Sequence, residues 1–184
     1  NMSADSSRAR LETALARIGA RKGEGARACL TVYREEAIAA ADAADARARS
    51  GISLGALDGA IVSIKDLFDV AGEVTRAGSK VVAEEGKPAE RDAPAVRALR
   101  AGGAIIVAKT SMSEFAFSGV GMNPHYGTPG NPADRARVLA QRLHLVGVRR
   151  VVVQEAAREP ARAERHGHGD VGNLVAAHGH LERA

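Results

Sequence analysis

The sequence predicts an α/β protein in which N-terminal helices precede a partial mixed or parallel sheet with flanking helices. Two short apolar runs, residues 59–64 and 104–108, have the length and β-branched content of buried strands, and a lysine follows each run. A helix signal lies between them, and two alanine-rich segments come before residue 51. Strand, helix and strand in this order form a parallel unit with a right-handed crossover.

The alanine-rich segments, residues 6–20 and 27–50, are predicted to form two helices. Gly23 and Gly25 separate them, and Gly51 is a natural stop for the second. Apolar side chains recur at helical spacing along the second segment, at Leu30, Tyr33, Ala37, Ala41, Ala44 and Ala48. Such a stripe predicts a helical hairpin that packs on the rest of the fold in a structural role.

The first predicted strand ends in Lys65 and the second in Lys109. Asp92 and Pro94 indicate the start of the helix between them, because an aspartate can cap free amides and a proline suits the first turn. Two glycines at 102–103 end that helix. Both lysines therefore fall at the carboxyl ends of strands, where open α/β sheets place their ligand sites.

The composition is that of a globular protein. Of the 184 residues, 45% are hydrophobic and 26% charged, and no run approaches 18 apolar residues, so we expect a cytoplasmic protein with no membrane partner. Cys29 stands alone, which excludes an internal disulfide framework. The net charge is +4, but only three Phe, two Tyr and no Trp could stack on bases, so nucleic acid is not an expected partner.

Three stretches of sequence carry a resemblance to a known family. In order, LDGAIVSIKDLFDVAG, RALRAGGAIIVAKTSMSEFAFSG and NPHYGTPGNPADRARV resemble the first half of the amidase-signature family of amide hydrolases, over residues 54–138. The resemblance implies hydrolysis of a carboxylic amide C–N bond through a Ser-Ser-Lys triad, with a small-molecule amide as substrate and no cofactor. In that triad a neutral lysine contacts a serine that bridges to the nucleophilic serine. Lys65 occupies the lysine position.

The chemistry of a strand-end lysine agrees with the role of general base for Lys65. An ammonium group cannot accept a proton, so the pKa of such a base must be lowered by desolvation, which an apolar strand end supplies. Several polar residues are candidates to orient it, and the sequence does not choose among them: Ser63, Asp66, Ser111, Ser113 and Ser118.

The segment after the second strand is expected to help wall the acyl pocket. By resemblance, Ala116, Phe117 and Ser118 are the substrate-binding candidates. For Phe115 we expect a place in the core instead. Lys109 is expected to form a buried structural ion pair that supports the active-site loops, because buried lysines are seldom unpaired.

Residues 139–184 depart from the family pattern. A Gly/Ser-rich signature with the bridging serine, the nucleophile and the oxyanion-hole amides should follow the Asn131-Pro132 pair, but residues 139–184 contain no Ser or Thr. We therefore expect the amidase to be inactive as it stands, and a change of reading frame at about codon 138 would explain the change in composition. The alternative is a non-catalytic truncated or frameshifted fragment that acts at most as a binding or interaction module.

The same tail is rich in histidine. His166, His168, Asp170, His178 and His180 are suitable ligands for zinc or nickel, but they follow no H-E-x-x-H or cysteine-bearing pattern. We therefore predict no metal site from this compositional feature.

The predicted organisation has three parts. These are an N-terminal helical region over residues 1–53, an amidase-like α/β segment over residues 54–138 and an Arg/His-rich tail over residues 139–184. A partial sheet has edges and apolar faces that nothing covers, and a homo-oligomer is one way to cover them.

Overall fold

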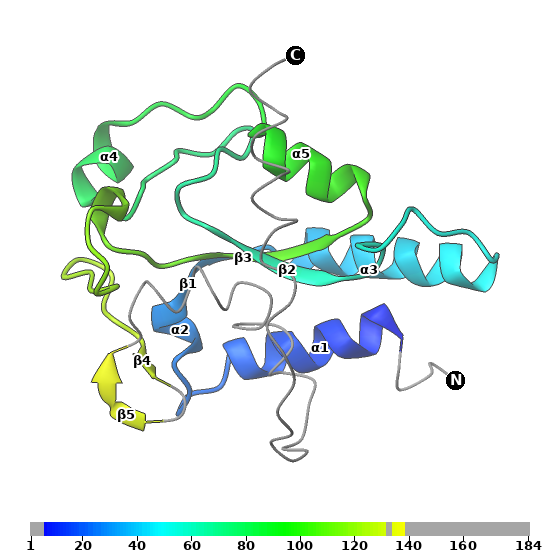
Figure 1. Ribbon diagram of the computed structural model, residues 1–184, viewed down its shortest axis with the longest axis horizontal. Helices are drawn as coiled ribbons and strands as arrows, with labels where there is room; N and C mark the ends of the chain where they lie inside the picture. Colours follow the sequence, from blue (N-terminus) through cyan, green and yellow to red (C-terminus); the bar gives the residue numbers. More distant parts are fainter. Residues whose placement is uncertain (1–5, 132–133, 139–184) are drawn as a thin grey trace, which may run out of the picture.

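The computed structural model describes residues 6–131 and 134–138, and it confirms the α/β fold class (Figure 1). The helices are α1 (Ser7–Ile18), α2 (Gly25–Ala28), α3 (Arg34–Arg49), α4 (Lys80–Glu85), α5 (Pro94–Ala101) and the 3-10 helix η1 (Glu114–Ala116). The strands are β1 (Cys29–Val32), β2 (Ile61–Lys65), β3 (Ile105–Thr110), β4 (Gly130–Asn131) and β5 (Asp134–Val138). The predicted tail, residues 139–184, lies outside the described residues.

The main sheet has three strands in the order β1-β3-β2. β2 runs parallel to β3 and the crossover between them contains α5, as the strand–helix–strand pattern predicted. β1 lies antiparallel along the other edge of β3, so the sheet is mixed. β4 and β5 pair separately in a two-stranded sheet.

A β-bulge interrupts the central strand. Val62 of β2 pairs with Ile106 of β3, but the next pair joins Ser63 to Ala108. One extra residue of β3, Val107, therefore lies between the two pairs, and the alternation of side chains between the two faces shifts by one from this point.

The two faces of the sheet are covered by different helices. α1 and α3 lie along one face and α5 lies over the other (Figure 1). The core on the first face consists of Leu11, Leu15, Cys29, Ala37, Ala41, Ile105, Val107 and Ala108. The core on the α5 face consists of Tyr33, Ile64, Val70, Val96 and Ile106. Val107 and Ala108 are neighbours in sequence yet share a core, which is the packing consequence of the bulge.

The prediction of one helix over residues 27–50 was wrong at its start. The Cys-Leu-Thr-Val segment forms β1, because β-branched and apolar residues fit a sheet edge and the edge of β3 is available to pair with it. The rest of the prediction holds: α3 begins at Arg34, and Ala37, Ala41 and Ala44 are buried.

The helix α5 begins and ends where predicted, but Asp92 does not cap it. Its N-cap residue is Ala93, with no side-chain hydrogen bond. The carboxylate of Asp92 instead accepts a hydrogen bond from the backbone N–H of Ala71, at 2.8 Å, and pairs with Arg100 at 3.1 Å. Asp92 therefore ties the crossover loop to the helix.

None of the helices within residues 6–131 and 134–138 combines the length and the apolar character that crossing a membrane requires.

Candidate active site

Lys65 is the last residue of β2. Its backbone pairs with Thr110 at the end of β3, and its carbonyl accepts a hydrogen bond from the N–H of Phe68, at 3.1 Å, which turns the chain away from the sheet. The side chain is partly buried, and this burial lowers the pKa of the amine below its usual value, because the charged form loses solvation. The pKa of Lys65 is therefore shifted in the direction that a general base requires.

The bulge places the two lysines on opposite faces of the sheet. In the observed register Lys65 pairs with Thr110, and Lys109 pairs with Ile64. Ile64 belongs to the core on the α5 face, so Lys109 lies on that face and Lys65 on the other. If the register of Val62 and Ile106 continued without a bulge, Lys65 and Lys109 would be direct cross-strand neighbours.

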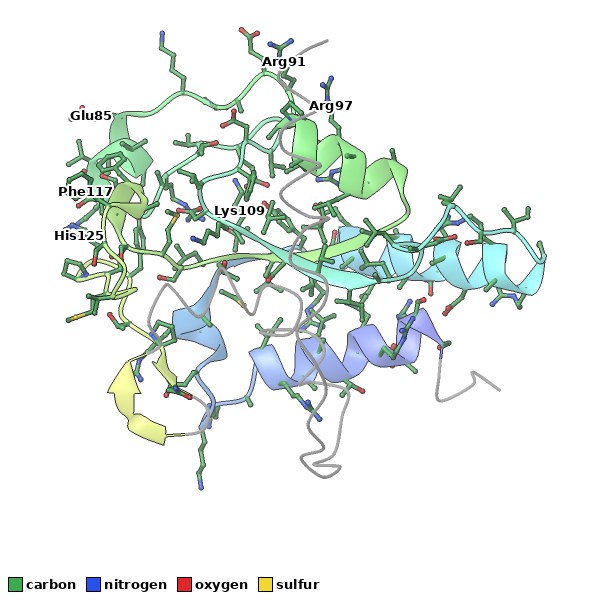
Figure 2. The ribbon with its side chains drawn as sticks, viewed as in Figure 1. Glu85, Arg91, Arg97, Lys109, Phe117 and His125 are labelled. Atoms are coloured by element: carbon green, nitrogen blue, oxygen red, sulfur yellow. The ribbon has the colours of Figure 1, made fainter. Side chains whose placement is uncertain are left out.

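Lys109 forms the buried ion pair that was predicted for it. Its side chain is 0% exposed, and its Nζ lies 3.0 Å from Oε2 of Glu73. The same Oε2 accepts a hydrogen bond from the hydroxyl of Tyr33, at 2.9 Å. Burial, and then this hydrogen bond, raise the pKa of Tyr33, so it stays protonated as a donor. Figure 2 shows Lys109 inside the fold, beneath the loop that leads to α5.

Asp66, one of the candidates to orient Lys65, is fully buried and engaged with other residues. Nε and Nη2 of Arg76 donate to its Oδ1, at 3.1 and 3.0 Å, and the backbone N–H of Gly78 donates to Oδ2 at 3.1 Å. Asp66 therefore anchors residues 76–78 beside the end of β2.

Asn123 extends this anchor to the segment after β3. It is 1% exposed, and its Nδ2 donates to the carbonyls of Gly78 and Met112, both at 2.8 Å. Its Oδ1 accepts from the backbone N–H groups of His125 and Tyr126. One amide side chain thus holds together the loop after β2, the segment after β3 and the loop that follows.

The serine candidates are placed differently from one another. Ser63 lies on β2 opposite Ala108. The hydroxyls of Ser111 and Ser113 are buried and have no hydrogen-bond partner among the residues that the structure describes. The segment after β3 thus holds two buried hydroxyls whose hydrogen-bonding capacity is not used within the described part of the chain.

The residues predicted to wall the acyl pocket lie at the surface. Ala116 and Phe117 are exposed, with Phe117 96% exposed, and Ser118 is partly buried. Figure 2 shows Phe117 at the outer edge of the fold. The prediction of Phe115 as a core residue was wrong: it is 57% exposed, and its backbone has φ of 50°, in a turn that directs the segment outward.

Sequence reasoning did not single out Glu73, Arg76 or Asn123. Asn123 opens the Asn-Pro-His-Tyr-Gly stretch of the third matching segment, and this context was a signal that could have found it. Glu73 and Arg76 lie in a loop whose composition gave no such signal. The part of the chain that is described holds no group of three or more His, Cys, Asp or Glu side chains suited to a metal ion.

Comparison with known proteins identifies the family. The family model for Amidase matches residues 9–140, and the chain belongs to this family. It is 43% identical over 128 residues to the AtzE component of 1-carboxybiuret hydrolase from Pseudomonas sp. (strain ADP), covering 69% of this chain and 27% of that protein. It is 44% identical over 127 residues to one of the subunits of glutamyl-tRNA(Gln) amidotransferase from Anaeromyxobacter dehalogenans (strain 2CP-C), covering 69% and 25%. The chain thus spans about a quarter of the length of these curated relatives.

Solved structures show the same similarity in three dimensions. A chain from a vestigial protein complex that bears on the origins of an s-triazine catabolic enzyme aligns with a TM-score of 0.66 at 41% identity, covering 72% of this chain and 29% of that one. The native peptide amidase from Stenotrophomonas maltophilia aligns with a TM-score of 0.60 at 31% identity, covering 71% and 28%. The observed fold is therefore part of the amidase fold.

Proposed function

We propose that this chain supplies the general base of an amidase active site, and that Lys65 is that base. The observation that carries the proposal is the position of Lys65 at the carboxyl end of β2, where burial lowers the pKa of its amine. A lowered pKa increases the neutral fraction of the lysine at a given pH, and only the neutral amine can accept a proton.

The proposed reaction is hydrolysis of the C–N bond of a carboxylic amide. Lys65 takes a proton from a bridging serine, and that serine takes one from the nucleophilic serine as its oxygen attacks the amide carbonyl. Backbone N–H groups stabilise the oxyanion, the amine or ammonia leaves with a proton, and water hydrolyses the acyl-enzyme. We assign Ala116, Phe117 and Ser118 to the wall of the acyl pocket, and their position at the surface supports access by a substrate.

The substrate is proposed at the level of a class, a small-molecule amide. The names of the relatives describe a carboxybiuret hydrolase, a glutamyl-tRNA amidotransferase and a peptide amidase, which share amide chemistry and differ in substrate. Two of these proteins are named as subunits, which supports a homo-oligomer or a partner for this chain as well.

We further propose that this polypeptide alone does not complete turnover. Residues 139–184 contain no Ser or Thr, so that segment supplies neither the bridging serine nor the nucleophile of the proposed mechanism. This observation favours a second candidate function, a non-catalytic binding or interaction module of the same fold. Translation of the other reading frames from about codon 138 tests its origin: a Gly/Ser-rich run supports a frameshift, and its absence in every frame contradicts one.

Two measurements on the full chain test these proposals. The first is ammonia release from a simple primary amide, where we expect no difference between the wild type and Lys65→Met. Release that is lost in Lys65→Met and retained in Lys80→Met, a substitution of a lysine on the surface of α4, would refute the proposed inactivity while supporting Lys65 as the base.

The second measurement is an NMR titration of isotopically labelled lysine side chains, with the Lys65 signal assigned by its absence in Lys65→Met. We expect Lys65 to titrate below the usual value of a lysine amine. A Lys65 amine with an ordinary pKa would contradict the role of general base.

A further inference from the structure

A cavity lies between the loop that follows β2 and the loop that joins α4 to α5. Its volume is about 360 Å³, and sites that hold small molecules span about 300–1,000 Å³. Lys65 is not one of the residues that line it. The cavity therefore has the size of a small-molecule site, and the proposed amidase reaction makes no use of it.

Backbone hydrogen bonds hold the two loops together. The N–H of Gly72 donates to the carbonyl of Ala89 at 2.8 Å, and the N–H of Ala89 donates to the carbonyl of Glu73 at 2.9 Å. Next to the start of α5, the N–H of Ala93 donates to the carbonyl of Asp69, at 2.9 Å. Figure 1 shows the second loop running from α4 to α5. The backbone thus fixes the walls of the cavity before a ligand binds, which lowers the cost of binding.

Apolar side chains form the inner wall of the cavity. Val74, Val82 and Ala89 line it and are partly buried. The two valines approach each other at Gly86, where a Cβ would lie 2.7 Å from Cγ1 of Val74 and 3.3 Å from Cγ1 of Val82. A side chain at position 86 would collide with Val74, so the glycine keeps this wall closely packed. Such a surface favours the aliphatic part of a ligand.

Charged residues of both signs form the rim of the cavity. Asp69, Lys87, Glu90 and Arg91 all line it and are exposed. Within residues 6–131 and 134–138 none of these four side chains forms an ion pair, and the hydroxyl of Thr75 donates a hydrogen bond to Asp69. Figure 2 shows Arg91 on the loop as it approaches α5. Two positive and two negative charges are therefore available to a ligand.

We propose that this cavity binds a free α-amino acid with an aliphatic side chain. The two basic rim residues attract its carboxylate, the two acidic rim residues attract its ammonium group, and the valines contact its side chain. A simple anion would meet two carboxylates and a simple cation would meet two cationic side chains, so a molecule with both charges matches the rim best. This site does not depend on the proposed function of Lys65.

An NMR titration of the isotopically labelled full chain with L-leucine tests the proposal. We expect saturable shifts of backbone amide signals from residues 72–75 and 86–91. Two analogues serve as controls: isocaproate lacks the ammonium group, and isoamylamine lacks the carboxylate. Each should bind about tenfold more weakly than leucine, because it loses the attraction of two rim residues and keeps the repulsion of the other two.

Matched substitutions locate the site. Arg91→Met removes one cation from the rim and should weaken leucine binding about threefold, and the double variant Lys87→Met/Arg91→Met should weaken it about tenfold. Lys80→Met removes a cation of α4 that does not line the cavity, and it should leave leucine binding unchanged. The same spectra show whether each variant is folded.

Stronger binding of leucine than of both analogues, together with weaker binding to the rim variants, supports the proposal. The proposal is overturned if leucine causes no saturable shifts, if either analogue binds as tightly as leucine, or if the Lys87→Met/Arg91→Met and Lys80→Met variants bind leucine equally. If the double variant does not fold, the comparison of leucine with its two analogues on the wild type decides alone.

Discussion

Replacing Glu73 by glutamine should destabilise the fold by about 3 kcal/mol. The substitution leaves the ammonium group of Lys109 buried without a counter-charge, and losing one partner of a buried ion pair costs about 3–5 kcal/mol. We take the lower end of this range because the Glu73 side chain is 31% exposed, so water already screens part of the interaction. Glutamine keeps the shape and a hydrogen-bond acceptor for Tyr33, which confines the change to the charge.

Replacing Lys109 by methionine should cost less, about 1 kcal/mol, because a volume-conserving change in a core is well tolerated. The carboxylate that remains is solvated and retains the hydroxyl of Tyr33. Glu73→Gln should therefore exceed Lys109→Met by about 2 kcal/mol, and the double variant should resemble Lys109→Met alone.

Equilibrium unfolding in urea, followed by far-ultraviolet circular dichroism, measures these differences. The control is Glu84→Gln on α4, which removes an exposed pair with Lys80 at 3.9 Å and should change stability by less than about 0.5 kcal/mol. If Glu73→Gln costs no more than Lys109→Met, or if the effects of the two substitutions simply add in the double variant, the pair does not compensate a buried charge and the reasoning fails.

Two further predictions concern the same region. Because the pKa of Lys65 is lower in the folded chain than in the unfolded chain, the unfolded state binds more protons between these two values, and stability should rise with pH there. Lys65→Met should therefore stabilise the protein more at pH 7 than near pH 10.5. Urea unfolding of the wild type and the variant at both pH values measures this, and a stabilisation by Lys65→Met that grew with pH would contradict it. Gly78→Ala should destabilise the fold by about 2 kcal/mol more than Gly72→Ala. Both glycines have positive φ, but a Cβ at Gly78 would lie 2.9 Å from Asn123 and from Met112, whereas a Cβ at Gly72 would meet open space. Equal losses of thermal stability in the two variants would refute the close packing at Gly78.

The sequence predicted the elements whose structure is determined by residues close together in the chain. The apolar runs of β2 and β3, the proline at the start of α5 and the spacing of Ala37, Ala41 and Ala44 each carry their own signal. β1 was missed because the alanine-rich stretch that follows it favours a helix, and its four residues become a strand by pairing with β3.

The candidate site divides in the same way. Lys65 and the ion pair of Lys109 followed from the cost of burying an amine, which any lysine in an apolar strand incurs. The sequence did not predict the residues that make contacts at the strand ends. Glu73, Arg76 and Asn123 lie in loops, and the course of these loops depends on tertiary contacts. Phe115 was misplaced for a related reason: its hydrophobicity favours burial, but the fold leaves its side chain 57% exposed.

The bulge in β3 makes the number of residues between Ile106 and Lys109 matter more than their identity. Substitutions at Val107 or Ala108 change the packing of one core and leave every side chain on its own face. Deleting either residue would close the bulge and leave Lys109 opposite Ile64, whereas one inserted residue with the bulge unchanged would bring Lys109 opposite Lys65 and remove it from Glu73. Among functional descendants of this sequence, we therefore expect the residues at these two positions to vary within small apolar types while insertions are absent from the stretch.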